Sequence, residues 1–237
     1  MKIKILFLLG FIVLLIASCK HDDDNVQTGY KVGDYYPDPN VTFRSPGVVA
    51  SGTAPAGIVF WLDPQDSRHG KIVSLDETKA HWSTIYSTTS ATDTGNGLTN
   101  ILQIKKQDDT FSHYPAFAWT HRKNKADETY SNASATGVWY LPAKNELKVL
   151  YAGYSGITSL WDDFSNMPDY NNPNRAAARK AFDSKLEAAG GNAFTTNYYW
   201  SSSEGDNSLA WEVNFSNGYT TNLNESSPDM ARCILNF

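Results

Sequence analysis

The sequence predicts an α+β domain, in which helices precede an antiparallel sheet. Residues 198–237 are short runs that alternate apolar and polar side chains between turn sequences, which is typical of an antiparallel meander. Two stretches before this meander, residues 143–151 and 173–189, carry apolar residues at helical spacing. Two β-type runs, residues 58–62 and 71–75, begin the predicted domain. Helices segregated from antiparallel strands in this way favour α+β over an alternating α/β fold.

Residues 1–18 have the layout of a secretory signal peptide. Two lysines near the start are followed by an apolar run over residues 5–16, and small residues then precede Cys19. An apolar run of about 12 residues is too short to cross ~30 Å of hydrocarbon as a helix. We therefore expect residues 1–18 to be a signal peptide.

The sequence around Cys19 indicates a lipid anchor. Residues 16–19, Ile-Ala-Ser-Cys, resemble the lipobox of bacterial lipoproteins, in which the signal is cut before the cysteine and the cysteine is lipidated. Each buried methylene contributes about 0.8 kcal/mol and two acyl chains hold stably. The resemblance therefore implies that Cys19, with palmitate-type chains, binds the membrane. The alternatives are a secreted protein in which Cys19 is incidental, or an uncleaved helix.

The residues after Cys19 bear on which way the protein faces. Residues 20–24, Lys-His-Asp-Asp-Asp, cannot pack and predict a solvated tether. They resemble the acidic export signals of surface-exposed lipoproteins in some Gram-negative bacteria, which implies an outer-membrane protein facing the exterior. A plain spacer facing the periplasm is the alternative. We expect residues 19–53 to form the anchor, tether and an extended arm, and residues 54–237 to form the domain.

The first predicted elements of the domain are a hairpin and a short helix. Residues 58–62 and 71–75 pair naturally across a polar loop. An i, i+3, i+4 stripe that starts at Leu98 predicts a short helix. A main helix follows Pro142, and Gly153 is expected to end it.

The second main helix carries start and stop signals. Asn172 can cap it, Pro173 suits the first position, and Gly190 and Gly191 can stop it. Its expected buried stripe consists of Phe182, Leu186 and Ala189. After this helix we expect strands at residues 198–203, 210–215, 219–223 and 231–237. We also expect the run at residues 58–62 to pair with the closing strand.

Three blocks of this sequence match a known pattern. They are residues 137–142 (Gly-Val-Trp-Tyr-Leu-Pro) with Glu146-Leu147 and Leu150-Tyr151; residues 199–204 (Tyr-Trp-Ser-Ser-Ser-Glu); and Ala210-Trp211 with Phe215, Gly218 and Arg232-Cys233. Together they resemble the major paralogous domain family (FISUMP), which is related to the C-terminal domain of collagen-like bacterial adhesins (Lcl). The resemblance spans residues 54–237. It implies a C-type-lectin-like fold, similar also to formylglycine-generating enzymes, with two main helices and a twisted antiparallel sheet.

One position departs from the family pattern. Ala143 stands where the family usually has Ser or Thr, which would cap the helix after Leu141-Pro142. We therefore expect Asn145 or a backbone turn to cap this helix instead, or else a loosely held helix start.

Composition bears on several function classes. The formal net charge is −5 and no basic patch follows the chain, so we expect no nucleic-acid partner. Formylglycine-generating enzymes hold copper with paired cysteines, whereas this chain has only Cys233 besides Cys19, which argues against that oxidase activity. Cys233 lies in a strand-like run and is interpreted as a buried small hydrophobe.

The serines do not indicate a nucleophile. The chain has no Gly-x-Ser-x-Gly elbow, and its serines at 201–203 are expected to satisfy backbone groups.

Histidines and acids do not form a recognisable metal or catalytic pattern. His81, His113 and His121 have no metal-ligand spacing, and we interpret them as structural or exposed. Alternation puts Glu212 and Asn214 on one strand face, which offers a lectin-type calcium site two ligands at best. The acidic loop at residues 161–169 does not have EF-hand spacing. We expect no enzyme activity, no cofactor and no metal.

A binding function fits the longest irregular stretch, which follows Tyr151. It places aromatic side chains among acids and amides, the usual chemistry for stacking on a sugar ring and bonding its hydroxyls. The alternative is that Trp161 and its neighbours fill the core beneath a long loop. The candidate ligand-binding residues are Tyr154, Trp161, Asp162, Asp163, Tyr170 and Asn171. We expect extracellular recognition or adhesion toward a glycan or a host surface protein, with a structural or accessory subunit of a surface complex as the alternative.

Overall fold

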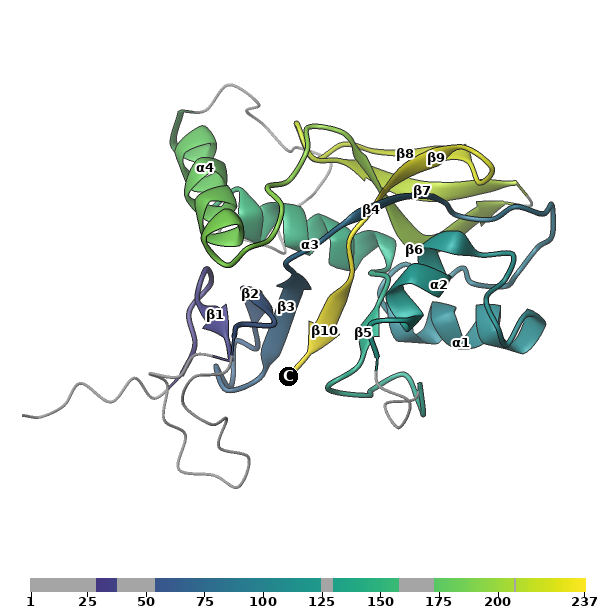
Figure 1. Ribbon diagram of the computed structural model, residues 1–237, viewed down its shortest axis with the longest axis horizontal. Coiled ribbons are helices and arrows are strands. Elements are labelled where there is room, and N and C mark those ends of the chain that lie inside the picture. The colour runs from purple at the N-terminus through teal and green to yellow at the C-terminus, as the bar shows by residue number, and fades with distance from the viewer. Residues whose placement is uncertain (1–28, 38–53, 125–129, 158–172, 207) are drawn as a thin grey trace, which may run out of the picture.

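The computed structural model describes residues 29–37, 54–124, 130–157, 173–206 and 208–237. Within these ranges the chain forms four helices and two five-stranded sheets (Figure 1). The α+β class predicted from sequence is therefore confirmed. The prediction of a single sheet is wrong, because the strands divide into two sheets.

The first sheet has the strand order β1-β2-β3-β10-β5, and every neighbouring pair is antiparallel. Its strands are β1 (Tyr35–Tyr36), β2 (Gly57–Leu62), β3 (Gly70–Ser74), β10 (Ile234–Asn236) and β5 (Trp139–Tyr140). The predicted hairpin is confirmed as β2–β3. The predicted pairing of the β2 run with the closing strand is wrong, since β3 lies between them.

The second sheet has the order β4-β9-β6-β7-β8. Its strands are β4 (Thr78–His81), β9 (Pro228–Ala231), β6 (Tyr198–Asp206), β7 (Leu209–Asn214) and β8 (Thr220–Asn224). The contact between β6 and β9 is parallel and consists of the single pair Tyr199 and Met230. The predicted closing strand at 231–237 is in fact interrupted, because Arg232 and Cys233 carry the chain from β9 in this sheet to β10 in the first (Figure 1).

Part of the predicted N-terminal arm belongs to the domain. β1 pairs with β2, and the ring of Tyr36 stacks on that of Phe237 with centroids 4.3 Å apart. Tyr30 is buried in the same small cluster, with Val59, Ile72 and Leu235. The predicted domain start at residue 54 therefore leaves out Tyr30 and β1, which pack with the domain. The predicted signal peptide, Cys19 and the acidic tether lie outside the described residues.

The helices are α1 (Gly97–Gln107), α2 (Pro115–His121), α3 (Lys144–Tyr154) and α4 (Pro173–Ala188). α1 begins where the Asn96 side chain accepts from the backbone N–H groups of Leu98 and Thr99. α4 starts at Pro173 and ends before Gly190, as predicted, and Gly190 has φ +80°. Of its predicted stripe Phe182 and Leu186 are buried, while Ala189 is only partly buried; the proposed cap Asn172 lies outside the described residues.

The central helix α3 lies between the two sheets and contacts β2 of the first and β6 and β7 of the second (Figure 1). Most of its residues are buried, as expected of a helix enclosed by core. Gly153 does not end α3, which continues to Tyr154. A Cβ at Gly153 would stand 2.3 Å from the Phe60 carbonyl oxygen, so this glycine permits close helix–strand approach.

None of the helices within the described ranges combines the length and the apolar character needed to cross a bilayer.

Candidate functional site

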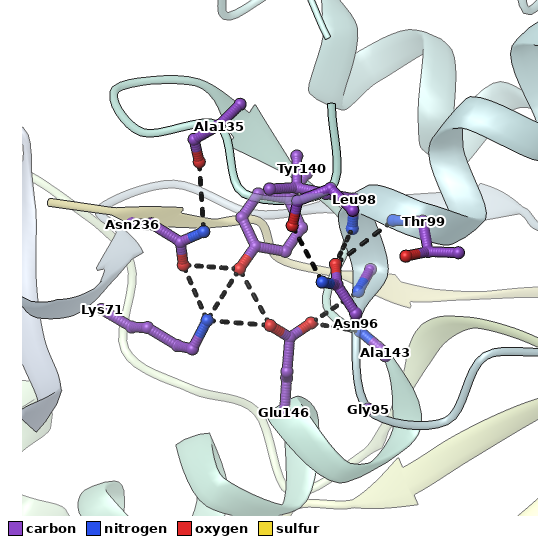
Figure 2. Close-up of polar contacts among 12 residues, drawn as sticks. Lys71, Gly95, Asn96, Leu98, Thr99, Ala135, Tyr140, Ala143, Glu146 and Asn236 are labelled. Carbon is purple, nitrogen blue, oxygen red and sulfur yellow. Dashed lines mark hydrogen bonds and ion pairs between the residues drawn. The ribbon is translucent and has the colours of Figure 1, made fainter. Parts of the chain in front are cut away.

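The densest group of buried polar contacts lies where the first sheet meets α3. It joins four side chains from four elements: Lys71 on β3, Tyr140 on β5, Glu146 on α3 and Asn236 on β10 (Figure 2). Tyr140 and Glu146 both belong to the first of the three sequence blocks. Tyr140, Glu146 and Asn236 lie 69 to 165 residues after Lys71 in the sequence, so only the fold brings Lys71 to them.

Glu146 is the centre of this group and is 7% exposed. Its Oε1 accepts from Lys71 Nζ and from the Tyr140 hydroxyl, both at 2.9 Å. Its Oε2 accepts from the backbone N–H groups of Gly97 at 2.8 Å and Ala143 at 2.9 Å. One carboxylate thus fixes the start of α1, the start of α3 and two strands of the first sheet.

Asn236 completes the group. Its Oδ1 lies 2.7 Å from both Lys71 Nζ and the Tyr140 hydroxyl, and its Nδ2 donates to the Ala135 carbonyl at 3.2 Å. Burial, together with the Glu146 carboxylate, raises the pKa of Tyr140 well above its usual range. Tyr140 is therefore a neutral hydrogen-bond donor. Since every one of these side chains is partnered within the group, its chemistry is that of a structural junction.

The start of α3 shows how the chain manages without a capping side chain at Ala143. Glu146 reaches back to the Ala143 N–H, which is one half of a capping box. The next two N–H groups donate outside the helix, Lys144 to Ser203 Oγ at 3.0 Å and Asn145 to the Thr94 carbonyl at 2.7 Å. The expected cap by the Asn145 side chain is therefore wrong, because that side chain is exposed and Ser203 on β6 takes the role.

Two of the three serines of the second block, Ser201 and Ser203, satisfy backbone groups as predicted, whereas Ser202 bonds a side chain. Ser201 Oγ donates to the Trp211 carbonyl and Ser203 Oγ donates to the Asp93 carbonyl, both at 2.7 Å. Ser202 Oγ accepts from Asn100 Nδ2 at 3.0 Å. All three serines are fully buried. These contacts hold β6 against β7 and α1 rather than presenting a nucleophile.

The candidate ligand-binding residues divide into one described residue and five that lie outside the described ranges. Tyr154 is the last residue of α3 and is 5% exposed. Its hydroxyl donates to Asp183 Oδ2 at 2.9 Å, and its ring packs against Phe182, Phe194 and Phe215. Tyr154 is therefore a core residue and is not available to stack on a ligand. Residues 158–172 contain the other five: Trp161, Asp162, Asp163, Tyr170 and Asn171.

The proposed lectin-type calcium ligands do not converge. Glu212 is 2% exposed and hydrogen-bonds the Asp229 carboxyl group, whereas Asn214 Oδ1 accepts from Ser216 in the turn after β7. Across the parts of the chain that the structure describes, no three His, Cys, Asp or Glu side chains gather as a metal site requires.

The second sheet contains buried acids that sequence reasoning missed. Glu204, Glu212 and Glu225 are 3%, 2% and 1% exposed. No ion pair among the described residues involves any of them. Glu204 and Glu212 lie on strands flanked by turns and Glu225 lies in the turn after β8, which are positions typical of solvated residues, and no sequence signal marks them as buried.

No family model matches this chain, and no curated protein matches it either.

The histidines and Cys233 are placed as expected. His81 Nδ1 lies 2.6 Å from the Ser226 carbonyl, and His113 Nδ1 lies 3.1 Å from Asp108 Oδ2. His121 packs against the rings of Phe111 and Tyr130. Cys233 is completely buried, and burial raises the pKa of its thiol to about 12. A thiol in this state is not a nucleophile.

Proposed function

We propose that this chain is a lipid-anchored outer-membrane protein, facing the cell exterior, whose domain acts in extracellular recognition or adhesion. The observation that carries the proposal is the sequence at its start, where a basic segment, a short apolar run and small residues lead to Cys19. The acidic residues 20–24 support the outward orientation. Palmitate-type chains on Cys19 would provide the anchor.

For the domain we propose membership of the FISUMP and Lcl-type group and a C-type-lectin-like fold. The support is that all three sequence blocks make contacts expected of a shared framework. Tyr140 and Glu146 tie the first sheet to α3, Ser203 binds the start of α3 from the second sheet, and Arg232 lies at the crossover between the sheets. Blocks that build a framework leave ligand specificity to the loops, which is where binding residues usually occur.

We propose that the ligand is a glycan or a host surface protein and that residues 158–172 contact it. The segment contains three aromatic residues, of which Trp161 and Tyr170 stand beside Asp162, Asp163 and Asn171. Tyr154 is no longer part of this proposal, because it is buried. The binding role is favoured over catalysis because Glu146 and its partners, which are the densest polar group described, hold the fold through satisfied bonds.

Two experiments test the proposal separately. In the first, cells are labelled with a palmitate analogue, and we expect label on the native chain and none on a Cys19→Ala variant. Protease added to intact cells is expected to digest the domain, while protection of the domain until the outer membrane is opened would contradict outward orientation. An unlabelled native chain would contradict the lipid anchor.

In the second experiment, the soluble domain from residue 20 onward is applied to a glycan array and to host cells. We expect binding that is lost in Trp161→Ala and Tyr170→Ala, with thermal melts unchanged. Tyr219→Ala is the matched control, since Tyr219 is 61% exposed and lies outside the segment. Absence of binding to every surface would refute recognition and favour the structural or accessory subunit.

A further inference from the structure

The turn between β8 and β9 buries a carboxyl group that forms no ion pair within the part of the chain that the structure describes. Glu225 is 1% exposed, and neither of its carboxyl oxygens has a hydrogen-bond partner among the described residues. Its backbone is firmly held, because its carbonyl accepts from Trp82 and Ser83 and its N–H donates to the Ser208 carbonyl. The Glu225 side chain therefore cannot reach water without disturbing this turn.

The groups that face Glu225 add negative charge or none. Glu204 and Asp206, both on β6, lie close enough to raise the pKa of Glu225, which burial and these two acids bring to about 8. The Glu204 carboxylate is itself held by Thr89. The backbone N–H and the side-chain hydroxyl of Thr89 both donate to Glu204 Oε2, each at 2.9 Å. Tyr114, at the start of α2, also faces these acids, and His81 at the end of β4 contacts the carbonyl of the neighbouring Ser226.

A second acid pair lies farther along the same sheet. Glu212 on β7 donates a hydrogen bond to the Asp229 carboxyl group on β9, an arrangement that requires a shared proton. Burial and Asp229 raise the pKa of Glu212 to about 8. The positive charge of Lys79 on β4 acts in the opposite direction, because it lowers the pKa of Asp229. Glu212 Oε2 has no partner among the described residues.

We infer that the second sheet is a proton-dependent element, in which the β8–β9 turn and the carboxyl contact of Glu212 with Asp229 stay packed only while Glu225 and the Glu212–Asp229 pair retain their protons. When these protons leave, uncompensated negative charge appears at two buried places in one sheet. Three of its strands, β7, β8 and β9, then loosen, because each charge can be hydrated only if its strand moves outward.

The direction of the pH effect follows from the raised values. A carboxyl group whose pKa is near 8 in the folded state and ordinary in the unfolded state keeps its proton to a higher pH when the protein is folded. Its stabilising effect is complete below the unfolded pKa and is lost as the pH rises toward 8. The domain should thus be less stable at pH 9 than at pH 5.5.

The test measures thermal melts of the native domain between pH 5.5 and 9. We expect the Tm to fall by at least about 7 °C over this range. Glu225→Gln and Glu212→Gln remove the ionisable group at nearly constant shape, so each should reduce the fall and raise the Tm at pH 9. Glu187→Gln is the matched control, because Glu187 is exposed on α4. A native Tm that does not depend on pH, or a fall that both glutamine variants retain in full, would overturn the inference.

Two further measurements locate the effect and separate it from ion binding. Hydrogen exchange of the native domain at pH 9 should be faster, relative to pH 6 and after correction for intrinsic rates, in residues 209–231 but not in residues 57–74. Equal acceleration in both regions would contradict an effect confined to the second sheet. Calcium at millimolar concentration should leave the Tm at pH 9 unchanged; a calcium-dependent rise that Glu225→Gln abolishes would show that a cation, not a proton, neutralises Glu225 and would overturn the inference.

Discussion

Replacing Glu146 with alanine should destabilise the domain more than any substitution at an exposed position of the same helix. The Glu146 carboxylate accepts four hydrogen bonds, two from backbone N–H groups at Gly97 and Ala143 and two from Lys71 and Tyr140. The alanine variant leaves these donors without their acceptor in a region where water has little access.

The expected cost can be worked from these contacts. An unsatisfied buried N–H costs about 1–3 kcal/mol, and breaking a buried ion pair costs about 3–5 kcal/mol. Lys71 is 20% exposed at its side chain and keeps Asn236 as a partner, so its share lies at the low end. We expect a total of at least about 5 kcal/mol, a large part of the roughly 5–15 kcal/mol that a domain of this kind possesses. This corresponds to a fall in Tm of about 10–20 °C.

Urea denaturation followed by far-UV circular dichroism measures this free energy directly. Glu146→Gln should cost less, about 2 kcal/mol, because the amide oxygen can still accept from Gly97 and Ala143. Combining it with Lys71→Met should cost less than the sum of the single changes, since the two groups form one ion pair. Asn145→Ala is the control and should change stability by less than about 0.5 kcal/mol, because the Asn145 side chain is exposed. A cost below about 1 kcal/mol for Glu146→Ala would refute the reasoning.

Three further predictions concern the core. Gly153→Ala should lower the free energy of unfolding by about 1–3 kcal/mol although alanine favours helices, because its Cβ would stand 2.3 Å from the Phe60 carbonyl; a thermal melt at or above the native value would contradict this. Tyr154→Phe should cost about 1 kcal/mol through loss of the bond to Asp183, measured by urea denaturation, and a stabilising change would show that the bond is not formed. Cys233 should react with a thiol reagent only after unfolding in urea, and rapid labelling of the native domain at pH 8 would contradict its complete burial.

Local sequence signals predicted most elements but not how the strands divide. The β2–β3 hairpin and α4 follow from turn residues and apolar spacing within short windows, and both are confirmed. The run at 231–237 looked continuous because apolar residues flank Arg232. Its interruption depends on distant partners, since the Arg232 guanidinium is fully buried against Glu77 at 2.9 Å and the Asn192 carbonyl at 2.7 Å. A charged residue in the middle of an apolar strand was the available signal.

The candidate site was predictable only in part, for a similar reason. Tyr154 continues the stripe of Leu147, Leu150 and Tyr151 at helical spacing, so a longer α3 would have placed it in the core. Glu146 was recognised as part of a block, but its partners lie on elements far apart in sequence. The buried place of Glu225 depends on distant partners, since its backbone bonds Trp82, Ser83 and Ser208, and no local pattern encodes this.

The corrected place of Tyr154 changes how the proposed binding segment should be tested. The Tyr154 hydroxyl on α3 bonds Asp183 on α4, so the two helices that flank residues 158–172 are joined directly. The Asp183 carboxylate also accepts from the Phe194 N–H at 2.9 Å, which ties α4 to the chain that leads into β6. A segment whose two ends are fixed in this way loses less conformational entropy on binding a ligand than one with free ends. Weaker binding in Tyr154→Phe would therefore show that the fixed ends matter, whereas only Trp161→Ala and Tyr170→Ala can test contact with the ligand.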